Sequence, residues 1–238
     1  MYKQQKVSVV IPTYNEAESI KGVIDDLFAT ALVDAVIAVD NNALGDTAEQ
    51  IKKTKAIYIK ESKNQGYGHA IMRGLKEATG DLIIITEADG TFQSKDVEKL
   101  LSYSDEFDAV LGTRTSPAVI WSGAFMPFFV RFGNYFWAKL IEVLFNATVL
   151  TDVGCTYKLI TRSALDKVID LFPLSKGDGT FNPEFMIWLL LRKVEMIEIP
   201  VIYKERTGKS MYTGSTWRAA KLGFKMLPII FKYFFTKP

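Results

Sequence analysis

Two carboxylates follow a run of apolar residues in the stretch GDLIIITEADGTF, which spans residues 80–92. In an extended chain Glu87 and Asp89 point to the same side, because successive side chains alternate. Two carboxylates aimed at one point repel each other unless a cation lies between them, and oxygen-only ligands suit Mg²⁺ or Mn²⁺. The pair is therefore predicted to hold a metal–diphosphate complex. The alternative is a solvated turn with Gly90 in a left-handed conformation.

The elements that must position this pair follow from the hydrophobic pattern of the first half of the chain. Apolar, β-branched runs alternate with segments of helical spacing, such as Ile20, Val23, Ile24 and Leu27. This alternation predicts an α/β fold with a mainly parallel sheet flanked by helices. The predicted strands are KVSVVIPTY, DAVIAVD, AIYIK, DLIIIT and DAVLGTR. We expect a catalytic domain over residues 1–210 and a basic, aromatic amphipathic tail over residues 211–238.

Polar residues stand where the predicted strands end. In a parallel α/β sheet, ligands bind beyond the carboxyl ends of the strands, so these residues are expected to share one edge. They are Tyr14, Asn15 and Glu16 after the first strand, Asp40, Asn41 and Asn42 after the second, Glu87 and Asp89 after the fourth, and Thr113 and Arg114 after the fifth.

Several segments occur in the order found in family 2 glycosyltransferases. They are VSVVIPTYNE, AVDNN with GDTA, NQGYGHAIMRG, TEADG, GTR, TDVGCTYKLITRSAL and IPVIYKERTGKS. Over residues 7–210 the chain most resembles the polyprenyl-phosphate sugar synthases. That resemblance implies a GT-A fold and an inverting, metal-dependent hexosyltransferase that uses Mg²⁺ or Mn²⁺. It implies a nucleotide-diphospho-sugar donor of the GDP-mannose or UDP-glucose type and a polyprenyl (dolichyl) phosphate acceptor.

The resemblance also implies roles for residues at matching positions. Asp89 is the main metal ligand with Glu87 beside it, Asp89, Asp152 and Arg206 are catalytic, and Arg114 and Arg131 lie near the acceptor phosphate. The nucleotide-binding positions are Pro12, Tyr14, Glu16, Asp40, Asn42, Gly66, Gly68, Ala88 and Lys209.

Two positions depart from the family's usual pattern. Glu87 stands where the family usually has aspartate, so its longer arm either moves the metal contact to a water or frees the carboxylate to bind the sugar. Asn41 stands where a second aspartate is frequent, which removes one charge. Asp40 is expected to accept a hydrogen bond from a base N–H, which uracil and guanine both offer, so the donor base stays open.

The aromatic residues in the second half of the chain bear on the nature of the acceptor. Phe128, Phe132 and Phe136 begin a repeat of apolar residues every four positions that continues through Leu140 and Leu144. This pattern predicts either a buried amphipathic helix or an interfacial segment that admits a lipid and offers its phosphate a cation. The tail carries lysines among aromatic residues, which is typical of a membrane-surface helix but also of a helix that closes the fold.

A lipid phosphate is already anionic, so its oxygen needs no strong general base. An acceptor with a sugar hydroxyl, in polysaccharide or glycolipid synthesis, would need one, and Asp152, Asp178 and Glu184 are the candidates. A sugar-phosphate nucleotidyltransferase or a dinucleotide oxidoreductase would place a glycine-rich loop after the first strand, where this chain has PTYNE. A non-catalytic, transferase-like membrane-surface protein remains an alternative because of Glu87.

Bulk composition sets further limits. The chain has 238 residues, of which 48% are hydrophobic and 24% charged, and its net charge of +2 does not indicate a nucleic-acid-binding protein. The single cysteine, Cys155, excludes an internal disulfide and fits a reducing compartment. Residues 118–130 would span only about 20 Å as a helix, against about 30 Å of hydrocarbon, so no transmembrane helix is predicted. The expected location is cytoplasmic and peripheral, at the inner face of the membrane.

Overall fold

The computed structural model describes residues 1–171, 180–208 and 216–236. Strands and helices alternate through the first half of these residues, as the hydrophobic pattern predicts. The elements of this half are β1 (Val7–Thr13), α1 (Ile20–Ala29), β2 (Ala35–Asp40), α2 (Thr47–Lys52), β3 (Ile57–Lys60), α3 (Tyr67–Glu77), β4 (Leu82–Ile85), α4 (Asp96–Ser102) and β5 (Ala109–Thr113). The elements that follow are η1 (Pro117–Val119), α5 (Phe128–Phe145), β6 (Lys158–Thr161), α6 (Arg162–Val168), η2 (Ile169–Leu171), α7 (Phe181–Leu191), β7 (Met196–Pro200) and α8 (Thr216–Phe235).

The strands form one seven-stranded sheet in the order β3-β2-β1-β4-β6-β5-β7. All neighbouring strands run parallel except β6, which is antiparallel to both β4 and β5. The predicted mainly parallel α/β sheet is confirmed. Because β1 and β4 are direct parallel neighbours, the residues that follow these two strands emerge side by side at the same edge.

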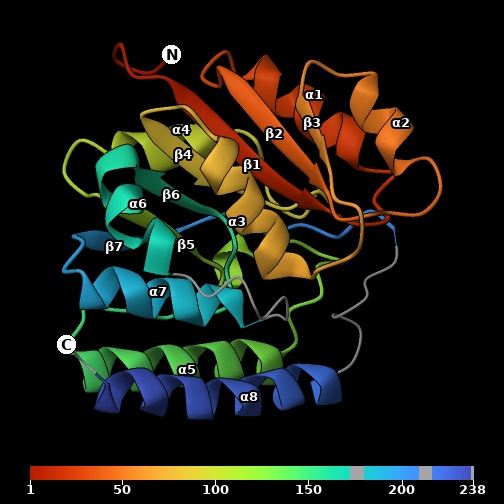
Figure 1. Ribbon diagram of the computed structural model, residues 1–238. Coiled ribbons are helices and arrows are strands. Elements are labelled where there is room, and N and C mark those ends of the chain that lie inside the picture. The colour runs from red at the N-terminus through yellow and green to blue at the C-terminus, as the bar shows by residue number, and fades with distance from the viewer. Residues whose placement is uncertain (172–179, 209–215, 237–238) are drawn as a thin grey trace.

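Helices cover both faces of the sheet, which explains the continuous apolar runs in strands such as β2 and β4. In β1, Val10 packs into a cluster with α3, α5, α6, α7 and α8, whereas Val9 and Ile11 face a second cluster with α1, α2 and α4. Figure 1 shows α7 between the sheet and the pair formed by α5 and α8. The strand β3 lies at the edge of the sheet, where Ile57 is half exposed.

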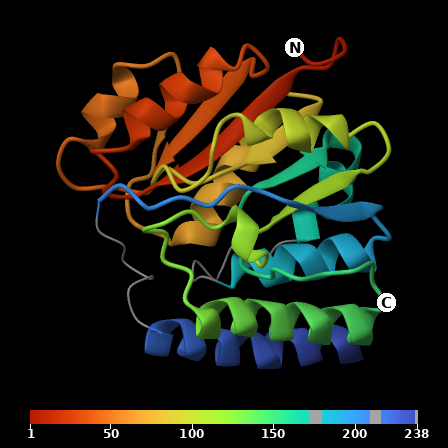
Figure 2. The ribbon, with the colours of Figure 1, turned by 180° about the vertical axis from the view of Figure 1, so that it is seen from behind.

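The helices α5 and α8 lie side by side and run in the same direction, below α7 in both views (Figure 1, Figure 2). The ring of Trp137 lies 6.2 Å from that of Phe224, and Phe145 lies 6.2 Å from Phe234. Through Tyr233, α8 also packs on α7, since its ring lies 5.0 Å from that of Trp188. The tail is thus packed against the rest of the chain over its described residues. The division at residue 210 falls within the undescribed residues and stays a prediction.

The helix α5 has two different faces. Its inner face buries Trp137, Ala138 and Ile141, in agreement with the amphipathic interpretation. The first part of its repeat is nevertheless exposed: 61% of Phe128, 56% of Phe132 and 50% of Phe136 lie open to solvent. Within the described residues, no helix combines the length and the apolarity needed to cross a bilayer.

One local prediction is wrong in its detail. The spacing of Asp46 and Glu49 predicts a side-chain cap at the start of α2, and α2 does begin at Thr47. The side chain of Asp46 makes no capping hydrogen bond, because its backbone (φ −85°, ψ 6°) lies outside the extended conformation that N-cap residues typically adopt.

Close packing between α3 and the sheet requires a glycine at position 74. A Cβ there would lie 2.3 Å from Cγ1 of Val10, whereas a Cβ at Gly22 of α1 would meet nothing within 4 Å. We expect Gly74→Ala to lower the free energy of unfolding by about 1–3 kcal/mol. The control Gly22→Ala is expected to raise it by about 0.5–1 kcal/mol. Urea unfolding measures both, and equal effects in the two variants would contradict the packing described here.

Candidate active site

The carboxyl edge of β1 and β4 gathers the acidic residues that the sequence singles out. The segment Tyr14–Glu16 follows β1, and the segment Glu87–Asp89 follows β4. The turn after β4 is closed by Gly90, whose φ of +76° is the left-handed conformation expected under the solvated-turn alternative, although Asp89 itself is buried. The backbone N–H and the hydroxyl of Thr91 donate to Oδ1 of Asp89 at 3.0 and 2.7 Å. The Asp89 carboxylate is therefore held in a fixed orientation.

Arg206 lies between two of these carboxylates. Its Nη1 donates to Oδ2 of Asp89 at 2.7 Å, and its Nη2 forms an ion pair with Glu16. The backbone N–H of Thr207 donates to the carbonyl oxygen of Asp89 at 3.0 Å, which fixes the segment carrying Arg206 against the turn after β4. The structure thus brings together three predicted site residues that are up to 190 positions apart in the sequence.

Burial and the neighbouring charge of Asp89 both raise the pKa of carboxyl groups at this edge. Burial raises the pKa of Glu87 to about 7, and the charge of Asp89 adds to the rise. Burial also raises the pKa of Glu16 to about 6, against the opposing effect of Arg206 and with a contribution from Asp89. A further cation would relieve this repulsion.

The donor set fits a divalent metal ion of the hard type. Glu87 and Asp89 offer carboxylate oxygens, and the guanidinium of Arg206 already occupies a cation's place between Asp89 and Glu16. In the part of the chain that the structure describes, no group of three or more His, Cys, Asp or Glu side chains could by itself hold a metal. Two carboxylates suit Mg²⁺ or Mn²⁺, which usually complete their ligands with water and substrate phosphates.

Asp40, at the end of β2, has a carboxylate that accepts hydrogen bonds from neighbouring protein groups. Asp40 is buried at the end of β2, where it accepts hydrogen bonds from the N–H of Ala43 at 2.7 Å and from the hydroxyl of Tyr58 at 2.8 Å. Sequence reasoning missed Tyr58, although its place on the neighbouring strand β3 faces β2. A role for Asp40 at the nucleotide base stays a prediction.

The contacts of Asn41 suggest why an asparagine, rather than the aspartate frequent in the family, stands at this position. Its Nδ2 donates to Oδ1 of Asn64 at 2.9 Å, while its Oδ1 accepts from the N–H of Gln65 at 3.0 Å. An amide can donate and accept at once, whereas an ionised carboxylate only accepts. Asn41 therefore orders the loop that leads to Gly66, the glycine before α3, whose φ is +97°.

The remaining predicted nucleotide positions that the structure describes stand at or after the carboxyl ends of β1, β2 and β4, or in the first turn of α3. Pro12 is buried in β1, Gly68 is buried in the first turn of α3, and Ala88 is buried between the two acidic residues. Tyr14 is partly exposed, and Asn42 has a positive φ of +60°. Lys209 and the alternative base Asp178 lie outside the described residues.

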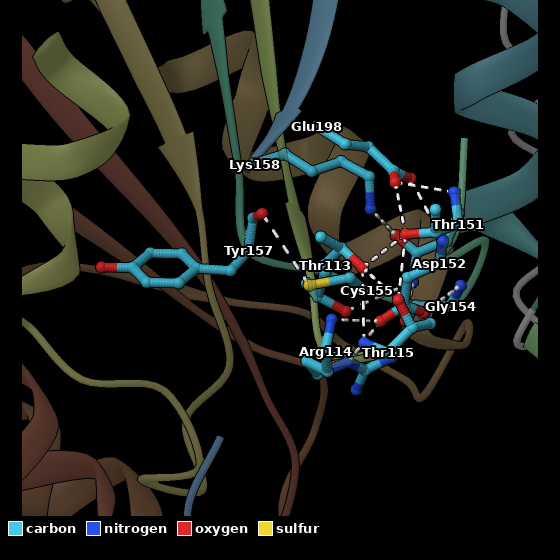
Figure 3. A network of polar contacts seen from close by, with 12 residues as sticks. Thr113, Arg114, Thr115, Thr151, Asp152, Gly154, Cys155, Tyr157, Lys158 and Glu198 are labelled. Carbon is cyan, nitrogen blue, oxygen red and sulfur yellow. Dashed lines mark hydrogen bonds and ion pairs between the residues drawn. The ribbon is translucent and has the colours of Figure 1, made fainter. Parts of the chain in front are cut away.

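Arg114 and Asp152 form a buried ion pair (Figure 3). Nε of Arg114 donates to Oδ2 of Asp152 at 2.9 Å, Nη2 donates to Oδ1 at 3.1 Å, and the Arg114 N–H also donates to Oδ2. Burial alone would raise the pKa of Asp152, but the charge and hydrogen bonds of Arg114 outweigh it and hold the pKa below its usual range. Both oxygens of Asp152 are thus engaged with the protein.

The turn that carries Asp152 is itself held from β7. Glu198 accepts hydrogen bonds from the N–H and the hydroxyl of Thr151, at 2.6 and 2.7 Å, and from the N–H of Asp152 at 3.1 Å (Figure 3). On the other side, the guanidinium carbon of Arg114 lies 4.9 Å from the ring centre of Tyr203. Arg114 is therefore fixed by contacts from several elements and is almost fully buried.

Arg131, the second predicted acceptor arginine, lies elsewhere. It stands in the first turn of α5 and is partly exposed, with its guanidinium carbon 5.8 Å from the ring centre of Phe128. One turn further along α5, the side chain of Asn134 contacts Gly154, since a Cβ at Gly154 would lie 2.7 Å from Oδ1 of Asn134 and 3.3 Å from Nη2 of Arg114. The start of α5 is thus next to the Arg114–Asp152 pair, whereas Arg131 itself joins the aromatic surface.

Glu184, the remaining candidate base, is buried within α7. It accepts hydrogen bonds from the hydroxyl of Thr180 at 3.0 Å and from that of Tyr233 at 3.4 Å. Its described contacts join α7 to α8, and the structure does not bring it into contact with Glu16, Glu87 or Asp89.

Comparison with known proteins gives a consistent result. The family model described as "Glycosyl transferase family 2" matches residues 8–169. The dolichyl-phosphate hexose transferase of Haloferax volcanii is 28% identical over 214 residues, which cover 88% of this chain and 87% of that protein. The dolichyl-phosphate beta-glucosyltransferase of Saccharomyces cerevisiae is 28% identical over 86% of this chain and 69% of its own length.

Among solved structures, the chain is similar to glucosyl-3-phosphoglycerate synthase from Mycobacterium tuberculosis, crystallised with Mn²⁺, UDP and glucosyl-3-phosphoglycerate. The TM-score is 0.71 at 16% identity, covering 99% of this chain and 81% of the other. At that identity the likeness concerns the fold alone, and it agrees with the predicted arrangement of sheet and helices.

The raised pKa of Glu87 has a measurable consequence for stability. A carboxyl whose pKa is about 7 in the folded protein and about 4.5 in the unfolded chain costs stability once it is ionised, so the cost grows between pH 4.5 and 7. We expect Glu87→Gln, measured by urea unfolding with a chelator present, to be more stable than the unsubstituted protein by on the order of 2 kcal/mol at pH 8. Near pH 4 the difference is expected to vanish. A difference that does not change with pH would contradict the electrostatic description of this edge.

Proposed function

This chain belongs to glycosyl transferase family 2, and we propose that it moves a hexose from a nucleotide-diphospho-sugar to a polyprenyl phosphate, with inversion at the anomeric carbon. The observation that carries the proposal is the cluster of Glu16, Glu87 and Asp89 around the cation Arg206 at the carboxyl edge of β1 and β4. A diphosphate with a divalent metal ion matches this cluster in charge, because the metal meets the carboxylates and the phosphates meet the arginine.

The donor side of the proposal assigns one task to each charged group. Asp89 and Glu87 would hold Mg²⁺ or Mn²⁺, which would supply positive charge next to the departing diphosphate. Arg206 is within reach of the same place and would exchange its carboxylate partners for phosphate oxygens as charge grows on the leaving group. The solved protein of similar fold was crystallised with UDP and Mn²⁺, which supports a nucleotide donor and a divalent metal ion as the ligands to test. GDP-mannose and UDP-glucose remain the donor types to test.

The acceptor side is supported by the state of the candidate bases. A hydroxyl acceptor needs a carboxylate that is free to take a proton. Among the described candidates, Asp152 is paired with Arg114 through both oxygens, and Glu184 accepts hydrogen bonds from Thr180 and Tyr233. A lipid phosphate is anionic without such a base, so positioning and charge neutralisation suffice for in-line attack. The names of the relatives, which act on dolichyl phosphate, point the same way.

A membrane surface is the proposed partner of the outer face of α5 and α8. Aromatic side chains are exposed there, with 75% of Phe129 and 70% of Phe224 open to solvent. Exposed lysines, Lys221 and Lys232, accompany the aromatic residues of α8, and Arg131 accompanies those of α5. Such a combination suits the headgroup region of an anionic bilayer and would place the chain peripherally on the inner face of the membrane.

The catalytic proposal is tested with radiolabelled GDP-mannose and UDP-glucose and with dolichyl or undecaprenyl phosphate as acceptor. We expect metal-dependent transfer to the lipid, and a loss of at least about 100-fold in Asp89→Ala, because a ligand of the charge-neutralising metal is gone. The control Asp26→Ala, an exposed position on α1, is expected to behave like the unsubstituted protein.

Full activity in Asp89→Ala, or in excess chelator, would contradict the metal assignment. Transfer to sugar hydroxyls but not to lipid phosphates would favour the alternative acceptor class. The absence of any transfer or donor hydrolysis across the panel would favour a non-catalytic membrane-surface protein.

The membrane proposal is tested by sedimentation with vesicles that contain anionic lipid. Burial of one phenylalanine side chain contributes about 1.5–3 kcal/mol, so Phe129→Ser and Phe132→Ser are each expected to weaken binding by about tenfold or more. The control Ile57→Ser removes a half-exposed apolar side chain from the edge strand β3, away from α5 and α8, and is expected to leave binding unchanged. Equal binding of all four proteins would contradict the assignment of this face.

A further inference from the structure

Three buried polar side chains form a hydrogen-bonded row that leads to the carboxylate of Glu87. It begins at Lys158 on β6, passes through Asn182 on α7 and ends at Thr156, which precedes β6. We propose that Thr156, supported by Asn182 and Lys158, is a positioning residue that fixes the Glu87 carboxylate for the metal–nucleotide complex. This inference rests on the proposed function, since it concerns the residue that would share the metal with Asp89.

Each hydrogen bond of the row is directed toward Glu87. Nζ of Lys158 donates to Oδ1 of Asn182 at 2.9 Å, Nδ2 of Asn182 donates to Oγ1 of Thr156 at 3.2 Å, and that hydroxyl donates to Oε1 of Glu87 at 2.8 Å. The orientation of the Asn182 amide follows from its partners, because an ammonium can only donate and the carbonyl of Gly154, at 3.3 Å from Nδ2, can only accept. The three hydrogen bonds therefore all donate in the same direction, from the Lys158 ammonium toward the Glu87 carboxylate.

The hydroxyl of Thr156 has its full set of partners. The hydroxyl carries one proton, which it donates to Oε1 of Glu87. Its two lone pairs then accept from Asn182 and from the hydroxyl of Tyr67, which lies in close contact with it. A hydroxyl with one donor bond and two acceptor bonds has no freedom to rotate, and it holds the carboxylate that it contacts.

The row is shielded from solvent along its length. Thr156 and Lys158 are each 1% exposed and Asn182 is 6% exposed. Burying an ammonium with an amide as its partner is costly, and burial lowers the pKa of Lys158 to about 8. Since an apolar side chain would fill the same space at less cost, the polar row is better explained by what it does to Glu87.

The longer arm of Glu87 is what makes this contact possible. An aspartate at the end of β4 would be shorter by one methylene group and would withdraw its carboxylate from Oγ1 of Thr156. The side chain of Asp89, by contrast, is oriented by Thr91 and Arg206. The two acidic residues of the pair are thus oriented by separate sets of donors, one buried behind the sheet edge and one in the turn itself.

The experiment compares Mn²⁺-dependent binding of UDP and of GDP by calorimetry in the full chain and its variants. Thr156→Val keeps the shape of the side chain and removes the hydroxyl, and we expect it to weaken the metal-dependent binding by about tenfold. Thr156→Ser restores the hydroxyl and is expected to bind as tightly as the unsubstituted protein. Nucleotide binding without metal is expected to stay unchanged in both, a separation that a general loss of packing would not produce.

The matched control is Thr47→Val. Thr47 is fully buried, and its hydroxyl lacks a hydrogen-bond partner among the described residues, so its removal is expected to leave binding unchanged. If Thr156→Val does not fold, as judged by circular dichroism, Lys158→Met replaces it. Metal-dependent nucleotide binding is then expected to weaken by about threefold, because the ammonium that orients Asn182 is gone.

Unchanged metal-dependent binding in Thr156→Val, or in Lys158→Met where that variant is used, would overturn the inference and leave the proposed function standing. A loss that Thr156→Ser fails to restore would overturn it as well, since the hydroxyl would then not be the cause. An unsubstituted protein that binds neither nucleotide in a metal-dependent way would overturn the proposed function, and the inference with it.

Discussion

Repulsion among carboxylates at the carboxyl edge of β1 and β4 is the constraint around which the site is organised. Burial raises the pKa of Glu16 and of Glu87, the charge of Asp89 adds to both rises, and Arg206 is the cation that joins Asp89 to Glu16. A folded chain maintains such a cluster only when other contacts hold it in place. Here they are the turn at Gly90, the hydrogen bonds of Thr91 to Asp89, and the buried row behind Glu87.

The fold supplies this arrangement through its topology. Because β1 and β4 are parallel neighbours, Glu16 and Asp89 meet although they are far apart in the sequence. The segment after β7 returns across the sheet edge and brings Arg206 to them. The antiparallel strand β6 supports the same edge from the other side, since Thr156 lies just before it and Lys158 lies within it. The ion pair of Arg114 with Asp152 stabilises the neighbouring turn, which adjoins the start of α5 and its exposed aromatic face.

The sequence predicts the features that local patterns encode. Continuous apolar runs located the first five strands, and the motifs spread over residues 7–210 indicated the family, whose model matches residues 8–169. The partners of those residues were out of reach, because they depend on tertiary contacts. Nothing near Asp152 in the sequence reveals that Arg114 occupies both its oxygens. The support of Glu87 by Thr156 and Asn182 joins positions 69 and 95 residues away, and its one local signal is an asparagine in the mostly apolar helix FNPEFMIWLLL, which also carries Glu184.

The position of a metal ion relative to Arg206 tests the central claim most directly. Anomalous diffraction from crystals soaked with Mn²⁺ and UDP or GDP would locate the ion and the diphosphate together. We expect the anomalous peak beside the carboxylates of Asp89 and Glu87, with Arg206 released from Glu16 and directed at the diphosphate. A diphosphate bound away from this edge, or bound here with no ion while Arg206 still bridges Glu16 and Asp89, would contradict it.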